Sequence, residues 1–219
     1  MHVGALVLCG GLLSCTCRAQ HFQNLDFENP GTQLAPDGIW LSWNLAVPGW
    51  NHPKGGDSLF VYHKSPPLDS IAQFYFLVDE TSTQWSPLEG NRSLALVSGH
   101  YNRNDANSPW VSAYIEQQAF VPENAETFHV MATGDFSLSL NEQSLPVSRL
   151  GENQYVADVS AYAGQYVTLR VANEATEIQT PVIVDKMEFS THTVPEPGTP
   201  ALMLMGLAVL AGRKLRKEE

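Results

Sequence analysis

Cysteine is nearly absent from this sequence, and the positions of the few cysteines limit where a disulfide or a thiolate metal site can form. All three cysteines, Cys9, Cys15 and Cys17, lie near the start of a chain of 219 residues. The rest of the chain therefore has no disulfide and no thiolate ligand for a metal ion. Its stability must come from the packing of apolar side chains, with a bound cation as the one further source that the composition leaves open.

Basic residues are also scarce. The chain has 12 Lys and Arg against 23 Asp and Glu, a formal net charge of -11. Between residues 20 and 194 there are only seven basic residues against twenty acidic ones. Such a surface repels phosphate groups, so we expect no nucleic-acid partner.

Motifs that organise catalysis are missing as well. The sequence contains no Gly-x-Ser-x-Gly, no His-Glu-x-x-His and no glycine-rich phosphate loop, and its histidines lack the spacing of zinc ligands. We therefore predict a protein that is not an enzyme. The alternative is a secreted polysaccharide hydrolase whose carboxylates converge from separate strands, since spacing along the chain does not reveal such a pair.

Sustained helical periodicity is missing from the region between the two ends. Short segments with β patterns take its place, and in residues 166–171 valine and leucine alternate with tyrosine, threonine and arginine, which predicts one buried and one wet face. Residues 20–193 are therefore expected to form an all-β antiparallel sandwich. The predicted strands are 71–78, 93–98, 111–120, 127–132, 135–140, 154–159, 166–172 and 182–189.

The start of the chain has the pattern of an export signal. Residues 3–13 are apolar and uncharged, and Cys17 to Ala19 form a small-x-small cleavage site, which predicts a signal peptide over residues 1–19. No Lys or Arg precedes the apolar stretch, so a buried N-terminal strand is an alternative. Residues 12–15 also resemble a lipobox, in which Cys15 would be acylated.

The end of the chain combines three motifs in a fixed order. A Pro-Glu-Pro tripeptide at 195–197 is followed by an uncharged run over 198–212 and a basic cluster over 213–217. A helix over the uncharged run would be about 22 Å long, so it spans a hydrocarbon core of roughly 30 Å only with snorkelling basic residues or local thinning. The basic cluster stays on the cytoplasmic side, which places the body outside. Residues 194–219 resemble the PEP-CTERM sorting signal.

The PEP-CTERM resemblance implies a partner and a destination. In that family a membrane-embedded cysteine protease, an exosortase, recognises the motif formed here by Pro195, Glu196 and Pro197 and removes the helix, as in other transient tail anchors. The resemblance implies a Gram-negative envelope, in which the inner membrane holds the protein transiently. Release to the cell surface or the exopolysaccharide matrix would follow.

The body shows a second resemblance. The segments Asn-Leu-Asp-Phe-Glu at 24–28, Val-Pro-Gly-Trp at 47–50, Ile-Glu-Gln-Gln at 115–118 and Ile-Val-Asp-Lys-Met-Glu-Phe at 183–189 resemble the galactose-binding-like jelly rolls of many carbohydrate-binding modules. This resemblance implies a jelly-roll sandwich for residues 20–193. A different β-sandwich is the alternative.

The jelly-roll resemblance also implies a structural calcium ion between the first and last strands. Glu28 and Asp185 are the matching acidic positions, and Asp26 joins them if residues 26 and 28 lie on one strand. Two carboxylates with backbone carbonyls and water would complete the shell of hard oxygens that Ca²⁺ requires. The alternative is that these acids are ordinary solvated strand ends.

Carbohydrate binding is the molecular activity that we expect of such a surface or matrix protein. Tryptophan offers a flat apolar face to a pyranose ring, while neighbouring polar groups bond the sugar hydroxyls. Trp50 matches a position that is structural in the resembling family and is expected to be buried. The candidate ligand-binding residues are Trp40, Trp43, Trp85 and Trp110.

Overall fold

The computed structural model describes residues 20–30, 40–52, 60–63, 72–82, 85–102, 104–175 and 179–192. Helix is limited there to the four-residue α1 (Trp43–Ala46) and a 3₁₀ turn (Ser160–Tyr162). No helix within these ranges is long and apolar enough to cross a membrane. The predicted signal peptide and the predicted sorting helix lie outside the described residues.

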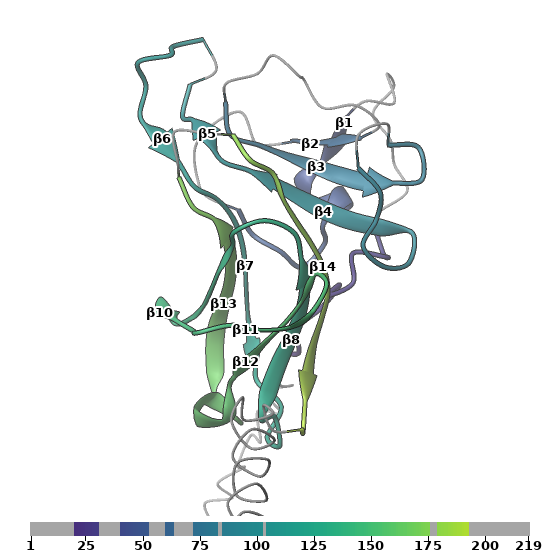
Figure 1. The fold of residues 1–219 in the computed structure, drawn as a ribbon, viewed down its shortest axis with the longest axis vertical. Helices are drawn as coiled ribbons and strands as arrows, with labels where there is room; N and C mark the ends of the chain where they lie inside the picture. The colour runs from purple at the N-terminus through teal and green to yellow at the C-terminus, as the bar shows by residue number, and fades with distance from the viewer. Residues whose placement is uncertain are drawn as a thin grey trace, which may run out of the picture.

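The larger of the two main sheets has eight strands (Figure 1). All of its neighbouring strands pair antiparallel, except β2 and β3, which run parallel. In spatial order the strands are β1 (Trp40–Ser42), β2 (Phe60–His63), β3 (Phe74–Asp79), β4 (Arg92–Val97), β14 (Val182–Ser190), β8 (Thr127–Ala132), β12 (Gln154–Asp158) and β11 (Ser148–Gly151).

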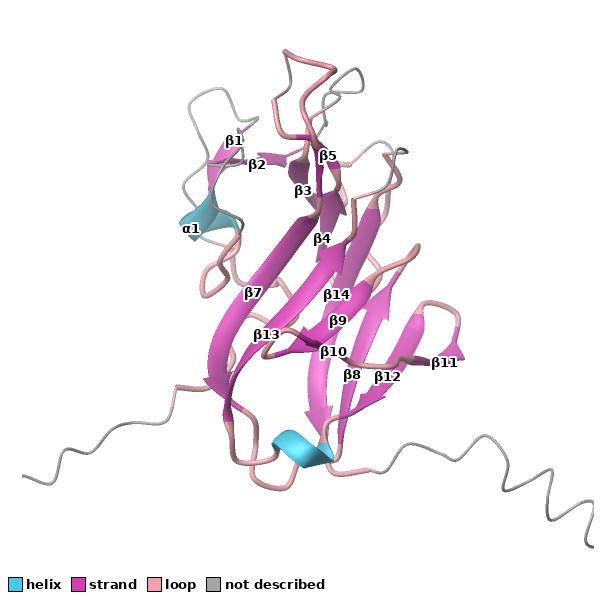
Figure 2. Ribbon diagram, turned by 90° about the vertical axis from the view of Figure 1, so that its left-hand side faces the viewer, coloured by secondary structure: helices cyan, strands magenta, loops and turns pink. Residues whose placement is uncertain are grey.

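The smaller main sheet has four antiparallel strands and packs across the larger one (Figure 2). A two-stranded sheet of β5 (Gly99–His100) and β6 (Trp110–Val111) lies at one end of the sandwich. The four strands are, in spatial order, β10 (Gln143–Ser144), β9 (Ser137–Leu140), β13 (Tyr166–Asn173) and β7 (Ala113–Phe120).

The hydrophobic core lies between the two main sheets. Ile115 on β7 and Leu169 on β13 belong to the same buried cluster as Leu94, Val130 and Val184 on the larger sheet. Along β7 buried residues alternate with more exposed ones from Ala113 to Phe120, as strand geometry requires when only one face is covered. The antiparallel sandwich expected from the sequence is therefore confirmed.

Strand β7 is the free edge of the four-stranded sheet, and it is bonded at two points to other parts of the chain. Asn51 and Glu116 exchange both backbone hydrogen bonds, at 2.8 and 2.9 Å. The N–H of Phe120 donates to the carbonyl of Gln20 at 2.9 Å. Segments near the start of the body thus cover part of this edge.

All eight predicted strands are present, with ends that differ by a few residues. The predicted strand 111–120 is interrupted at Ser112, which separates β6 from β7. The strands β1, β2, β5, β10 and β11 lie outside the predicted ranges. These additional strands are two to four residues long, and none alternates polar and apolar residues as the four-residue strand β9 does.

Because the buried cluster lies between Phe27 and Met187, residues 20–193 should fold without either signal. We expect a soluble protein whose far-UV circular dichroism is that of antiparallel sheet. Replacing Ile115 by Ala should lower the free energy of unfolding by about 2–5 kcal/mol, since it leaves a cavity between the sheets. Denaturant titration of both proteins measures this difference, and a helical spectrum or an unchanged midpoint would contradict it.

Candidate functional site

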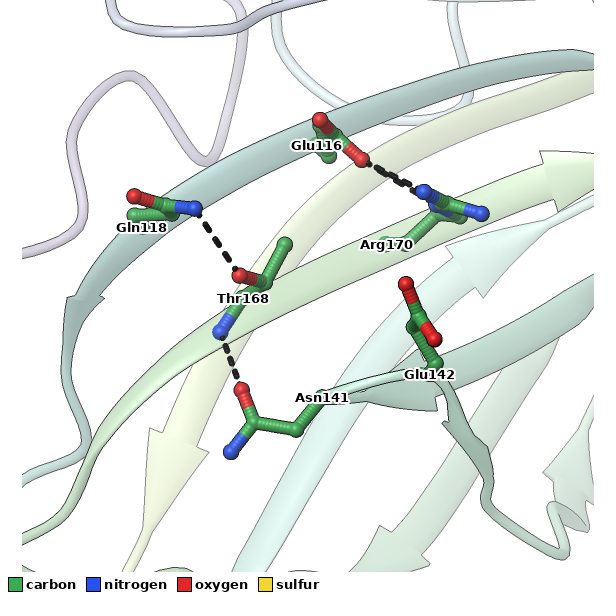
Figure 3. A pocket seen from close by; sticks show the side chains of 6 residues that line it. All are labelled: Glu116, Gln118, Asn141, Glu142, Thr168 and Arg170. Atoms are coloured by element: carbon green, nitrogen blue, oxygen red, sulfur yellow. Dashed lines mark hydrogen bonds and ion pairs between the residues drawn. The ribbon is translucent and has the colours of Figure 1, made fainter.

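A row of polar side chains covers the outer face of the four-stranded sheet. Glu116 and Gln118 on β7 lie opposite Arg170 and Thr168 on β13 in the strand register. With two residues of the turn after β9 they surround a hollow of about 350 Å³ (Figure 3). We call it the polar groove, lined by Glu116, Gln118, Asn141, Glu142, Thr168 and Arg170.

Arg170 is held in place at the centre of the polar groove. Its Nε and Nη2 atoms donate to one oxygen of Glu116 at 3.1 and 2.8 Å, and its guanidinium lies 4.2 Å from the centre of the Tyr114 ring. Partial burial lowers the pKa of Arg170, but the hydrogen bonds and charge of Glu116 outweigh it, and the pKa is raised overall. Arg170 therefore offers a fixed positive charge.

Hydrogen bonds also link three further groove residues, Gln118, Thr168 and Asn141. Gln118 Nε2 donates to Thr168 Oγ1 at 3.1 Å, and the Thr168 N–H donates to Asn141 Oδ1 at 2.8 Å. Asn141 and Glu142 both have positive φ, 49° and 66°, as the two central residues of a tight hairpin turn do. This turn directs Glu142 toward the groove (Figure 3).

An exposed aromatic pair continues the outer face beyond the groove. Phe120 and Tyr166 lie opposite each other in the register, two residues along from Gln118 and Thr168. Their ring centres are 5.1 Å apart, and the residues are 37% and 48% exposed. The outer face thus combines fixed hydrogen-bonding groups with an accessible apolar surface, the combination that a polyhydroxylated ligand requires.

The structure changes the roles of the predicted tryptophans. Trp43 is only 5% exposed and its N–H donates to the Trp50 carbonyl at 2.6 Å, so its expected ligand contact is wrong and it is a core side chain. Trp50 is buried as expected, and its N–H donates to the carbonyl of Asn24. Among the tryptophans whose side chains the structure describes, none lines the polar groove.

Three of the candidate tryptophans lie on other elements. Trp40 is the first residue of β1. Trp85 is half-buried against Phe76, with ring centres 5.6 Å apart. Trp110 is half-buried in the two-stranded sheet, and the centre of its ring lies 4.8 Å from the centre of the His100 ring. These three residues lie in separate parts of the body. Ligand contact by each of them stays a prediction.

Sequence reasoning missed the groove residues, although a signal for them existed. The alternation within 166–171 predicted that Thr168 and Arg170 face water. The corresponding prediction for Glu116 and Gln118 needed the register between β7 and β13, which pairs residue 116 with 170 and 118 with 168. Strand pairing is a long-range property that a single strand does not specify.

Glu28 and Asp185, the predicted calcium ligands, contact the same turn over residues 88–93. One carboxylate oxygen of Glu28 accepts hydrogen bonds from the N–H groups of Asn91 and Arg92. Partial burial raises the pKa of Glu28, but these backbone hydrogen bonds outweigh it and the pKa is lowered overall. A Cβ on Gly90 would lie 2.3 Å from this carboxylate, so only glycine permits the approach.

Asp185 contacts the same turn from β14 and is fully buried. Its Oδ2 accepts from Ser93 Oγ at 2.6 Å and from the Glu89 N–H at 3.0 Å, and its Oδ1 accepts from the Lys186 N–H at 2.7 Å. A β-bulge follows Asp185, where Lys186 has φ of 39°. Burial raises the pKa of Asp185 to about 6, although the hydrogen bonds counteract the rise.

Asp26 does not join these two acids as a strand neighbour. Residues 25–27 form a turn with positive φ at Phe27, and Asp26 Oδ1 accepts the Glu28 N–H at 3.2 Å. The expectation that residues 26 and 28 share one strand face is therefore wrong, because the opening segment is bent rather than extended.

The donors around Glu28 and Asp185 are N–H and O–H groups, which present hydrogens where a cation needs oxygen atoms. Within the described ranges, no group of three or more His, Cys, Asp or Glu could hold a metal ion. As bonded here, the two carboxylates form a hydrogen-bonded clasp on the turn rather than a calcium shell. Calcium binding stays a prediction.

Comparison with known families identifies one motif in the chain. Residues 193–217 match the PEP-CTERM protein-sorting motif. This match confirms the sorting interpretation of the C-terminal segment, and Pro195, Glu196 and Pro197 lie within the matched residues. Comparison with curated proteins gives no match.

The fold and the motif define an exported all-β protein with a membrane-anchored sorting tail. More specifically, the chain carries the tail of an exosortase substrate, and that tail implies sorting in a Gram-negative envelope.

Asp185 should make stability depend on pH. Its pKa is about 6 in the folded protein against an ordinary value of 3.8, so the folded state binds a proton more readily. This contribution is present below about pH 4 and is lost as the pH rises through about 6, a change on the order of 3 kcal/mol. In urea unfolding from pH 4 to 7, the Asp185→Asn variant should lack this change.

Glu188→Gln is the matched control, because Glu188 is an exposed acid on the same strand. The lowered pKa of Glu28 acts at lower pH and in the opposite sense, with stability lost as the pH falls, and it is common to all three proteins. A parent-minus-Asp185→Asn difference that stays constant with pH would contradict the assignment. Thermal melts with calcium and with a chelator test metal binding. A calcium-dependent rise in melting temperature that Asp185→Asn abolishes would establish a calcium site at Asp185.

Proposed function

We propose that the protein is a non-catalytic component of the cell surface or exopolysaccharide matrix and that its polar groove binds a carbohydrate. The observation that carries this proposal is the row of fixed polar side chains ending at an exposed aromatic pair. Amide, hydroxyl, carboxylate and guanidinium groups offer both donors and acceptors to sugar hydroxyls. Phe120 and Tyr166 offer a ring surface at the end of the row.

The charges of the groove favour a neutral glycan. Glu116 and Glu142 line it together with a single cation, Arg170, and one oxygen of Glu116 already accepts both bonds from this cation. The body as a whole is acidic. A polysaccharide rich in uronic acids would be repelled by the groove carboxylates and by the acidic body. A neutral polysaccharide needs only hydrogen bonds and stacking.

The commitment of Glu116 to Arg170 also supports binding over hydrolysis. A glycosidase needs one carboxyl group free to donate a proton and a second free to activate water or attack the sugar. Glu116 is occupied by the ion pair, and Glu142 lies on an exposed turn. The secreted hydrolase remains the alternative, and turnover of a bound polysaccharide would establish it.

A glycan array with residues 20–193 tests the binding proposal. We expect retention of neutral glycans, and Tyr166→Ala should weaken binding roughly tenfold, because about 1.4 kcal/mol of stacking corresponds to that factor. Tyr101→Ala is the matched control, since Tyr101 is 50% exposed and directly follows β5, which lies at the other end of the sandwich (Figure 2). Equal loss in both variants, or no glycan retained by the parent, would refute the groove as the site.

The sorting step is tested by Glu196→Ala. This variant should stay uncut and held in the inner membrane, because it removes the charged residue of the Pro-Glu-Pro motif. Membrane fractionation and the mass of the released protein measure the outcome. Glu219→Ala, a change at the last residue of the chain, is the control and should be released normally. Normal release of Glu196→Ala would contradict recognition of this motif.

A further inference from the structure

The first and last described residues of the body lie at the same end of the sandwich. The carbonyl of Gln20 accepts the N–H of Phe120, the last residue of β7. The carbonyl of His192 accepts Thr127 Oγ1 at 2.7 Å, and Thr127 is the first residue of β8. Since β7 ends where β8 begins, residues 20 and 192 lie at the same end of the sandwich, at the bottom of Figure 2.

This end is a hydrogen-bonded unit, which we call the tail-side cap and define as residues 121–126, 158–165 and 190–192. Val121 and the 158–165 loop bond each other twice, through Gln165 and Gly164. The Val159 N–H donates to the Glu126 carbonyl, and the Glu126 N–H donates to the Ser190 carbonyl. The last strand is thus fixed to both loops up to the point where the tail leaves.

Only Thr193 and Val194 separate His192 from the first proline of the sorting motif. Three residue steps of fully extended chain span at most about 11 Å. Because the bond from Thr127 holds His192 against the sandwich, the tail-side cap lies within about this distance of Pro195. A protease that binds Pro195 therefore works close to the tail-side cap, whereas β5 and β6 lie at the opposite end of the sandwich.

The charge of the tail-side cap distinguishes between two neighbours at the membrane. Glu123 and Asp158 are exposed, Glu126 is partly exposed, and the cap contains no Lys or Arg. Hydrogen bonds from the Ser160 hydroxyl and N–H lower the pKa of Asp158, so it stays charged. An acidic surface is repelled by anionic lipid headgroups and attracted by a basic protein surface.

We propose that the tail-side cap docks on a basic extracytoplasmic surface of the exosortase, so that the body itself is part of what the protease recognises. The proposal rests on the sorting motif and is independent of glycan binding. It assigns to the protease an interaction beyond Pro195, Glu196 and Pro197.

Site-specific photocrosslinking of the full chain tests this contact. p-Benzoylphenylalanine replaces Glu123 or Ser160 in the cap, Asn107 at the opposite end, or Val194 beside the motif, in cells whose exosortase lacks its nucleophilic cysteine. We expect protease adducts from positions 123, 160 and 194 and none from position 107. The uncut tail then keeps the substrate at the enzyme.

Each other result contradicts the proposal. Lipid adducts alone from positions 123 and 160 would mean that the cap rests on the membrane. An adduct from position 194 without adducts from the cap would mean that the protease contacts only the tail. Equally abundant protease adducts from position 107 would show that the body has no preferred orientation on the enzyme. If position 194 also gave no protease adduct, the sorting interpretation itself would be overturned.

Charge reversal supplies a second readout with native exosortase. Glu123→Lys should slow release of the body several-fold without changing its melting temperature, because the exposed side chain lies outside the core. Asp105→Lys, an equal change in the exposed loop at the opposite end, should leave release unchanged. Equal release rates for the two variants and the parent would overturn the electrostatic docking.

Discussion

The two-residue alternation of strands β7 and β13 is the constraint on which both the core and the candidate site depend. Burial of Ile115, Leu169 and their neighbours against the larger sheet fixes which side chains point inward. The residues between them, including Glu116 and Arg170, must then point to the opposite face. A slip of one residue would exchange the two sets, so the packing energy that holds the sandwich together also holds the groove in register.

Hydrogen bonds to buried or partly buried groups take over the role that disulfides play in many exported proteins. The opening segment of the body is tied to the last strand by the bond from the Met187 N–H to the Leu25 carbonyl. It is tied to β7 through Gln23 and Gln117, whose side chain both accepts from and donates to the Gln23 backbone. Glu28 and Asp185 then hold the turn over residues 88–93 between these two ends of the chain.

The sequence was most informative where a local pattern carried the information. Short segments with β patterns, several of them clearly alternating, located all eight predicted strands, and the order of three motifs located the sorting tail. The clasp illustrates a partial success, because Glu28 and Asp185 were expected together and do contact one turn. Most of their partners are backbone N–H groups, which residue identity does not reveal, so the sequence did not predict the chemistry of this contact. Trp43 was misplaced because aromatic residues serve cores and binding surfaces equally well.

The bridge between Asn51 and Glu116 has a consequence for the behaviour of many copies together. An edge strand with unpaired N–H and C=O groups is a template on which another chain can add a strand. Strand β7 is such an edge, yet its backbone is bonded near the middle by Asn51 and at the end by Gln20. A second copy would have to displace both contacts before it could pair along β7. Copies of the protein are thereby kept apart along this edge, however concentrated they become.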